Sequence, residues 1–212
     1  RQDYNWLDRY AGRFPIIQCC EYVPGLACPS VSIDNYGAAR EMTVYLQELG
    51  HRRIAMLGAD NQYISTRLRR EGYLDAMAQA GLPVEERWYA QADAVYSFAS
   101  GQEAARTLLA AVPRPTAVFC ISDILALSVI SAAQELGLDV PRDLTVTGFD
   151  DVDYTTMVHP SLTTIAQPCH ELGRQSVDLL DGPQNETAVP SERALLPPRL
   201  MKRESAAPPQ GN

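Results

Sequence analysis

Short apolar runs alternate with amphipathic stretches along the chain, and this alternation predicts an α/β fold with doubly wound parallel sheets. Parallel strands covered on both faces are continuously apolar, whereas helices repeat their apolar positions about every 3.6 residues. The predicted strands are Pro15–Cys20, Ser30–Ile33, Arg53–Leu57, Ala117–Cys120, Leu144–Phe149 and Leu162–Ile165. The predicted helices are Tyr36–Leu49, Thr66–Gln79, Ser100–Ala111, Asp123–Leu136 and His170–Leu180. Gly50, Gly81 and Gly137 each follow a predicted helix, where a left-handed cap is favoured.

The segment from Pro115 to Asp151 predicts a βαβ unit, because two apolar runs flank one helix and each run leads into an aspartate. Ser122 or Asp123 can cap this helix. Ligands of open α/β sheets bind outside the carboxyl ends of the strands. Asp123 and Asp150 therefore stand where a polar small molecule would bind.

The composition and net charge restrict the classes of protein to which the chain can belong. The chain has 212 residues, 46% of them hydrophobic, and a formal net charge of −8. Such a chain can bury one large core or two small ones. Its negative charge argues against binding to the phosphate backbone of a nucleic acid. Five cysteines without a CxxC pair, and no apolar run near the roughly 18 residues of a membrane span, predict a cytoplasmic protein without membrane contact. The chain begins at Arg1 rather than methionine, so we expect a fragment.

No pattern in the sequence indicates catalysis, a metal site or a cofactor. There is no phosphate-binding glycine loop and no nucleophile elbow. His51, His159 and His170 are too scattered to form a metal site or a catalytic base. The acids after Phe149 lack the glycine and distal glutamate of a calcium loop.

Six blocks, taken in order, resemble the LacI/GalR family of bacterial transcriptional regulators and, through it, the type I periplasmic-binding-protein fold. The blocks are Val31–Ala39, Leu49–Leu57, Arg67–Met77, Pro115–Leu127, Gly137–Asp151 and His159–Pro168. The last blocks, together with Glu21–Gly25, are most similar to the cytidine-repressor branch.

The resemblance implies a core of two subdomains joined by three crossovers, here without the DNA-binding headpiece and with an incomplete N-terminal subdomain. It divides the chain into a remnant of the N-terminal subdomain (1–33), the C-terminal subdomain (34–165), a return to the N-terminal subdomain (166–195) and a last strand of the C-terminal subdomain (196–204). The polar, proline-rich composition of residues 205–212 predicts a disordered tail. The stretch Asp181–Pro190 is expected to be a loop. An isolated fragment of this kind should bind effector weakly, if at all.

The same resemblance assigns Arg69 to the effector, and Asp150, at the end of its strand, is expected to bind the effector as well. A guanidinium offers paired donors to hydroxyl groups or a carboxylate, and an aspartate can accept two hydrogen bonds from vicinal hydroxyls. The alternative for Arg69 is a solvated helix arginine. An aromatic ring against the ligand is expected from Tyr96, or else from Phe98, because the sequence has two extra residues in that loop. Both rings could instead only pack the loop.

Further candidates carry an alternative role. Ser65 can face the ligand, but its default role is to cap its helix, and capping is as good an explanation for Asp123. Gln167 lies at a crossover, where its amide could touch ligand. Cys20 ends a strand at a position that is often polar in the family. Leu127 and Val158 align with the family's dimer interface, or belong to the ordinary core.

We therefore interpret the chain as the effector-binding and dimerisation core of a LacI/GalR-type regulator, a repressor that senses a small sugar or nucleoside. Its partners would be that effector, a second copy of the chain and, through the headpiece alone, operator DNA. One alternative is a periplasmic sugar- or nucleoside-binding protein with the same fold. Another is a hydrolase or sugar-modifying enzyme that uses Asp123 and Asp150 as an acid and base pair, although nothing in the sequence separates their pKa values.

Overall fold

The computed structural model describes residues 5–8, 10, 13–26, 28–181 and 193–210. Its helices are α1 (Asn5–Asp8), α2 (Asn35–Glu48), α3 (Ile64–Gln79), α4 (Phe98–Leu109), α5 (Asp123–Glu135) and α6 (Cys169–Asp181), with short 3-10 turns η1 (Glu86–Trp88) and η2 (Asp153–Thr156). Its strands are β1 (Gln18–Cys19), β2 (Ser30–Ile33), β3 (Ile54–Ala59), β4 (Tyr89–Ala92), β5 (Ala117–Cys120), β6 (Thr145–Thr147), β7 (Thr164–Ala166), β8 (Arg193–Leu196) and β9 (Arg199–Met201).

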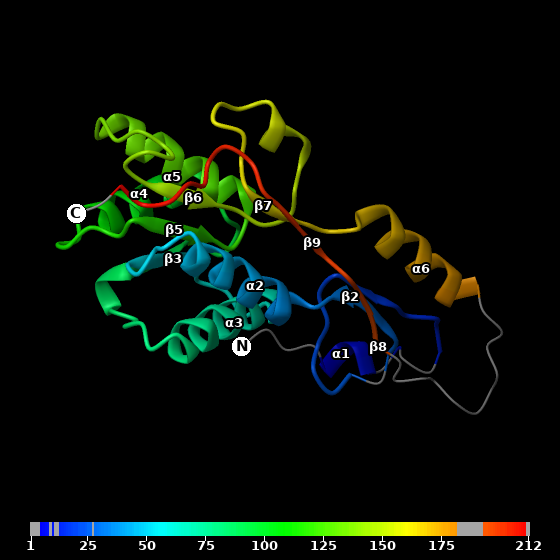
Figure 1. The fold of residues 1–212 in the computed structure, drawn as a ribbon. Helices are drawn as coiled ribbons and strands as arrows, with labels where there is room; N and C mark the ends of the chain where they lie inside the picture. Colours follow the sequence, from blue (N-terminus) through cyan, green and yellow to red (C-terminus); the bar gives the residue numbers. More distant parts are fainter. Residues whose placement is uncertain (1–4, 9, 11–12, 27, 182–192, 211–212) are drawn as a thin grey trace.

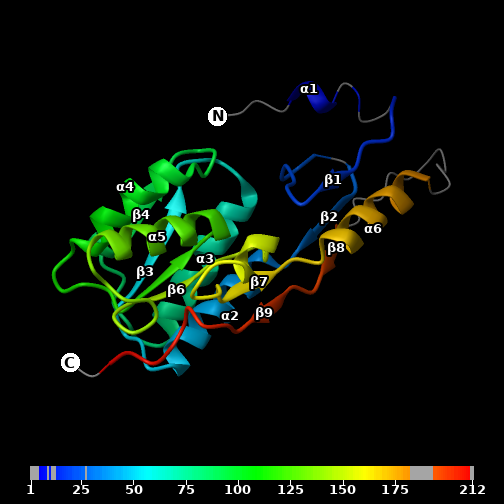
Figure 2. The same ribbon diagram turned by 90° about the horizontal axis from the view of Figure 1, so that it is seen from above.

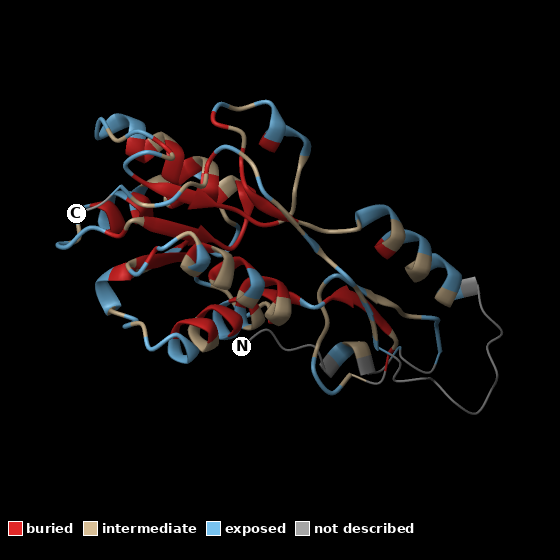
Figure 3. Ribbon diagram, in the orientation of Figure 1, coloured by how far each residue is buried: buried red, intermediate tan, exposed pale blue. Residues whose placement is uncertain are grey.

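The larger body of the molecule is a parallel sheet with strand order β4-β3-β5-β6. Helices α2 and α3 pack together on one side of it, and α4 and α5 pack together on the other (Figure 1). Because helices cover both faces, β3, β5 and β6 are buried along their whole length. Figure 3 shows that the buried residues concentrate in these strands and the inner helix faces.

The smaller body contains the parallel sheet β1-β2-β8 with α6 packed against β1 and β2. The chain passes between the two bodies after β2, after β7 and after β8. The antiparallel pair β7–β9, in which Thr164 faces Met201, lies between them (Figures 1 and 2). The predicted α/β fold is therefore confirmed, but not every strand pair is parallel.

Most predicted elements agree with the structure to within a few residues. Gly50, Gly81 and Gly137 have positive φ angles of 100°, 64° and 72°, which confirms them as helix ends. Strand β4 was absent from the predicted strands because its residues are only partly buried and include Gln91, so they form no continuous apolar run. The predicted last strand within residues 196–204 corresponds to β9, which joins β7, but β8, which joins β2, was not predicted; Pro197 and Pro198 separate the two strands.

The described part of the predicted tail, residues 205–210, is ordered rather than disordered. The Ser205 side chain is fully buried, and its hydroxyl donates to the Val146 carbonyl at 2.6 Å. The Ala207 carbonyl accepts hydrogen bonds from His51 and from Thr145, each at 2.9 Å. Proline and polar residues suggested disorder, but the segment satisfies its polar groups by lying along the edge of the larger body. The loop expected at Asp181–Pro190 falls, apart from Asp181, outside the described residues.

Candidate functional site

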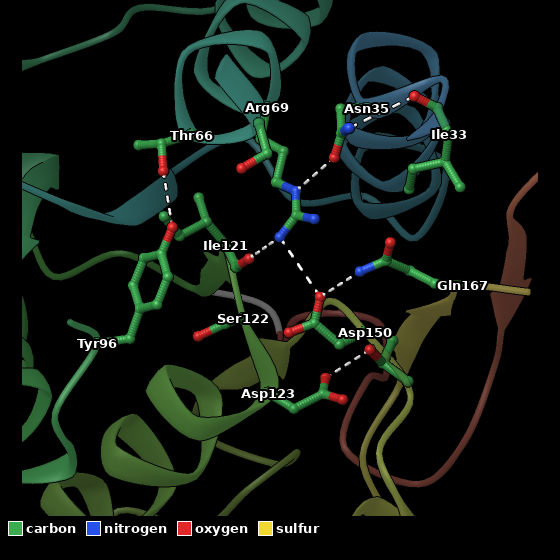
Figure 4. Close-up of polar contacts among 12 residues, drawn as sticks. Ile33, Asn35, Thr66, Arg69, Tyr96, Ile121, Ser122, Asp123, Asp150 and Gln167 are labelled. Atoms are coloured by element: carbon green, nitrogen blue, oxygen red, sulfur yellow. Dashed lines mark hydrogen bonds and ion pairs between the residues drawn. The ribbon is translucent and has the colours of Figure 1, made fainter. Parts of the chain in front are cut away.

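Four polar side chains from distant parts of the sequence meet where the two bodies join (Figure 4). We call Asn35, Arg69, Asp150 and Gln167 the junction cluster. Asn35 begins α2 directly after the first crossover, and Gln167 follows β7 at the second. Arg69 comes from α3, and Asp150 follows β6. The topology of parallel strands thus brings three of the predicted residues, Arg69, Asp150 and Gln167, to one place.

Arg69 is a buried arginine whose Nε and Nη1 atoms have partners within the protein. Its side chain donates from Nε to Asn35 Oδ1 at 2.9 Å and from Nη1 to the Ile121 carbonyl at 2.5 Å. Nη1 also lies 3.5 Å from Asp150 Oδ1, and the guanidinium carbon lies 3.6 Å from the centre of the Phe149 ring. With only 7% of its surface exposed, Arg69 is not the solvated helix residue of the alternative interpretation.

Asp150 links Arg69 to the second crossover. Gln167 donates from Nε2 to Asp150 Oδ1 at 2.7 Å. Burial raises the pKa of Asp150, although the neighbouring Arg69 charge and the Gln167 hydrogen bond oppose the rise. The side chain is still 31% exposed, so hydroxyl groups of a small molecule can reach it.

Asp123 does not cap α5, because the cap is Ser122, whose hydroxyl accepts the Leu125 N–H at 3.4 Å. Asp123 is 1% exposed, and ligand contact by its carboxylate stays a prediction. Asp123 Oδ2 accepts the Val152 N–H at 3.0 Å, and Oδ1 accepts the Thr164 hydroxyl at 2.5 Å. Burial raises the pKa of Asp123 to about 7, against the lowering effect of these hydrogen bonds.

The two aromatic candidates differ in their surroundings. Tyr96 is half-buried, and its hydroxyl lies 2.8 Å from the Thr66 hydroxyl on α3, three residues before Arg69 (Figure 4). Phe98 is the first residue of α4 and is 39% exposed. Tyr96 is therefore tied to the helix that carries Arg69, while contact of either ring with a ligand stays a prediction.

Ser65 does not cap α3, because the helix begins at Ile64 and Ser65 is its second residue. Its N–H instead donates to Glu21 Oε2 at 3.2 Å, and its hydroxyl donates to the other carboxylate oxygen. Glu21 follows β1 in the smaller body, so this carboxylate reaches across to the positive end of a helix in the larger body.

Of the remaining candidates, Cys20 lies at the surface, whereas Leu127 and Val158 are partly buried and Leu127 packs against the core. Cys20 is exposed, has a φ of 67° and lies with its sulfur 3.7 Å from that of Cys19. Leu127 and Val158 are half-buried, and near Val158 the Met157 side chain is 77% exposed. A ligand contact by Cys20 and a dimer interface at Leu127 and Val158 both stay predictions.

Two surface hollows lie away from the junction cluster. One, of about 290 Å³, is lined by α6 and Ala194. The other, of about 510 Å³, lies between α2 and the segment from Pro198 to Lys202. Neither is lined by a residue of the junction cluster, so we place the candidate site by the convergence of polar groups at the strand ends rather than by the size of a hollow.

The described residues lack two further kinds of feature, a metal site and a membrane-spanning helix. In that part of the chain, no three His, Cys, Asp or Glu side chains are grouped so that they could hold a metal ion. Of the helices described, none is long and apolar enough to cross a membrane.

Asn35 and Glu21 belong to the junction of the bodies but were not predicted. Both follow a strand closely, Asn35 after β2 and Glu21 after β1. The same rule of polar residues at carboxyl strand ends that indicated Asp150 could have found them.

Comparisons with known proteins agree with this architecture. The family model of the periplasmic binding protein-like domain matches residues 43–206. The chain is 38% identical over 191 residues to the HTH-type transcriptional repressor CytR of Escherichia coli (strain K12), which covers 90% of this chain and 55% of the repressor. It thus spans about half the length of the curated relatives it matches.

Two solved structures are similar over nearly the whole chain. A LacI family transcriptional regulator from Mycobacterium smegmatis has a TM-score of 0.86 and 31% identity, covering 98% of this chain and 76% of that one. A LacI family transcriptional regulator from Enterococcus faecium, with bound ribose, has a TM-score of 0.82 and 30% identity, covering 92% of this chain and 71% of that one.

Proposed function

We propose that this chain, which belongs to the LacI family of transcriptional regulators, is the effector-binding and dimerisation core of a repressor in that family. The observation that carries the proposal is the junction cluster. Arg69 and Asp150 present a guanidinium and a carboxylate beside each other, and both are held by residues of the crossovers, Asn35 and Gln167.

The effector we propose is a small sugar or nucleoside. Paired donors of Arg69 and the acceptor oxygens of Asp150 suit a molecule with several hydroxyl groups, and the partly exposed Asp150 carboxylate can accept hydrogen bonds from two of them. The bound ribose of the Enterococcus faecium regulator supports this class of ligand. Tyr96 would supply an apolar face beside α3.

The mechanism we propose is a shift between two relative orientations of the bodies. Asn35 and Gln167 lie at two of the crossovers, so a ligand that replaces or strengthens their contacts with Arg69 and Asp150 changes the free energy of one orientation relative to the other. The Glu21 link to α3 would be made in one orientation and lost in the other. Such a difference is what couples effector binding to operator affinity.

Operator DNA, a dimer partner and the compartment complete the proposal. A net charge of −8 is unfavourable for holding a phosphate backbone, so operator contacts would come from a part of the protein outside these residues. A second copy of the chain would pack on the surface around Leu127 and Val158, and the protein would act in the cytoplasm.

The comparisons favour a transcriptional regulator over the two alternatives, a periplasmic binding protein and an enzyme. The relatives reported above are transcriptional regulators rather than periplasmic binding proteins or enzymes. A hydrolase using Asp123 and Asp150 is further disfavoured because Asp123 is buried and both of its oxygens accept hydrogen bonds.

A thermal-shift screen of sugars and nucleosides, beginning with ribose, tests the proposal. A ligand with a dissociation constant of about 1 mM, present at about 50 mM, stabilises the folded chain by about 2.3 kcal/mol. For a protein of this size that corresponds to a rise in Tm of about 5–9 °C. Asp150→Asn should remove the shift, whereas Asp139→Asn, which changes an exposed carboxylate in the Asp139–Arg142 pair, should retain it.

Two results would contradict the proposal. If no sugar or nucleoside raises Tm at these concentrations, either in this chain or in a longer protein with a complete N-terminal subdomain, the ligand class is wrong. If a compound raises Tm equally in wild type and Asp150→Asn, it binds elsewhere and the junction cluster is not the effector site.

A further inference from the structure

The turn that carries Asp150 has a backbone conformation that residues with a Cβ rarely adopt. Asp150 has a φ of 119° and Asp151 a φ of 59°, in succession. Residues with a Cβ are sterically strained at these φ angles, so contacts with the surrounding structure must stabilise the turn. The direction of the Asp150 carboxylate depends on those contacts.

Asp123 supplies the contact directly after the turn. Its Oδ2 accepts the Val152 N–H at 3.0 Å, two residues beyond Asp150. On the near side, the Asp150 N–H donates to the Ile165 carbonyl at 2.9 Å. Because Asp123 is 1% exposed, water does not compete for its oxygens.

The Asp123 carboxylate is itself held from the remaining sides. Its Oδ1 accepts the Thr164 hydroxyl of β7 at 2.5 Å. At Gly148, directly after β6, a Cβ would overlap that same oxygen, so the glycine leaves the space that the carboxylate occupies. One buried acid thus connects α5, the turn after β6 and β7.

We propose that Asp123 is a positioning residue, whose buried carboxylate holds the left-handed turn at Asp150 and Asp151 and thereby directs the Asp150 carboxylate toward Arg69 and Gln167. The consequence for effector affinity rests on the proposed function of Asp150. The effect on the turn does not, because it exists in the ligand-free chain.

The charge of Asp123 provides a signature that a merely structural residue would lack. Burial raises its pKa to about 7, so the carboxylate gains a proton within an accessible pH range. The other titratable groups that face it are Asp150, Cys120 and Tyr154. When Asp123 is protonated, it is a weaker acceptor, and the amide resonance of Val152 should report the change.

The experiment is amide NMR and hydrogen exchange on this chain without ligand. In Asp123→Asn, exchange at Val152 should be at least about tenfold faster after correction for global stability, and the resonances of residues 150–152 should shift. In the control Thr164→Val, which leaves the Val152 acceptor in place, exchange at Val152 should stay within about threefold of wild type.

The pH profile is the second measurement and needs no variant. In wild type the Val152 and Thr164 amide resonances should titrate together near pH 7, and in Asp123→Asn they should not. The proposal is overturned if Val152 does not titrate in wild type, or if folded Asp123→Asn keeps wild-type exchange at Val152. Should Asp123→Asn not fold, the wild-type titration and Thr164→Val decide alone. Ribose binding, measured separately, tests the proposed function.

Discussion

Replacing Arg69 tests whether the junction cluster is a buried, mutually dependent set of groups. Arg69→Met keeps an unbranched side chain over the Phe149 ring but removes every donor. Asn35 Oδ1 and the Ile121 carbonyl, both on buried residues, would then lose their partner, and Asp150 would lose its cation.

The expected loss of folding stability can be worked out from these contacts. Two buried acceptors without a donor cost about 1–2 kcal/mol each. An ion pair of 3.5 Å would contribute about 5 kcal/mol at an effective dielectric constant of about 20. Because the Asp150 side chain is 31% exposed, solvent screening and the cost of desolvation reduce the net contribution of the ion pair to about 1–2 kcal/mol. We therefore expect Arg69→Met to lower the free energy of unfolding by about 3–6 kcal/mol.

Urea unfolding, followed by the fluorescence of the buried Trp88 and by circular dichroism, measures this loss. A double-mutant cycle with Asp150→Asn isolates the pair, with an expected coupling of about 1–2 kcal/mol. The control is Arg106→Met with Glu135→Gln, an exposed pair 2.8 Å apart for which we expect about 0.3–0.5 kcal/mol. A coupling for the buried pair no larger than that of the exposed pair would refute the reasoning.

Three further predictions concern other parts of the molecule. Burial lowers the pKa of His51, so as pH falls through about 6.5 the unfolded chain takes up a proton before the folded chain does. In urea titrations, the stability of wild type relative to His51→Gln should therefore decline below that pH, and a constant difference would contradict this prediction. Gly101→Ala should lower stability by about 1–3 kcal/mol, because the added Cβ would overlap Ser128 on α5. Gly173→Ala on α6, where the space around the glycine is open, should raise stability by about 0.5–1 kcal/mol. Equal effects of the two substitutions would contradict the close packing of α4 against α5 at Gly101. Glu21→Gln should weaken stability by about 0.3–1 kcal/mol at low salt and speed amide exchange in the first turn of α3, and no change in that exchange would mean that the link across the bodies is not made in solution.

The sequence by itself determined the elements and the rule for finding the site. Apolar runs and glycine caps are local properties, so they predicted the strands and helices within a few residues. They failed where burial is partial, at β4, and where two prolines divide the last segment between two sheets. Asp150 was indicated by its place after an apolar run alone, whereas the choice of Arg69 needed the resemblance to a family.

The partners of each side chain were decided only by the tertiary structure. Ser65 and Asp123 both begin helices in the sequence, where capping is the default expectation. Glu21, distant in sequence, occupies the start of α3 instead, and Asp123 is turned inward to Val152 and Thr164. Hydrogen bonds join whichever groups the topology brings within about 3 Å, and a buried polar group is bound to find one. Periodicity records which face of an element is buried, but not which residues of other elements are buried against it.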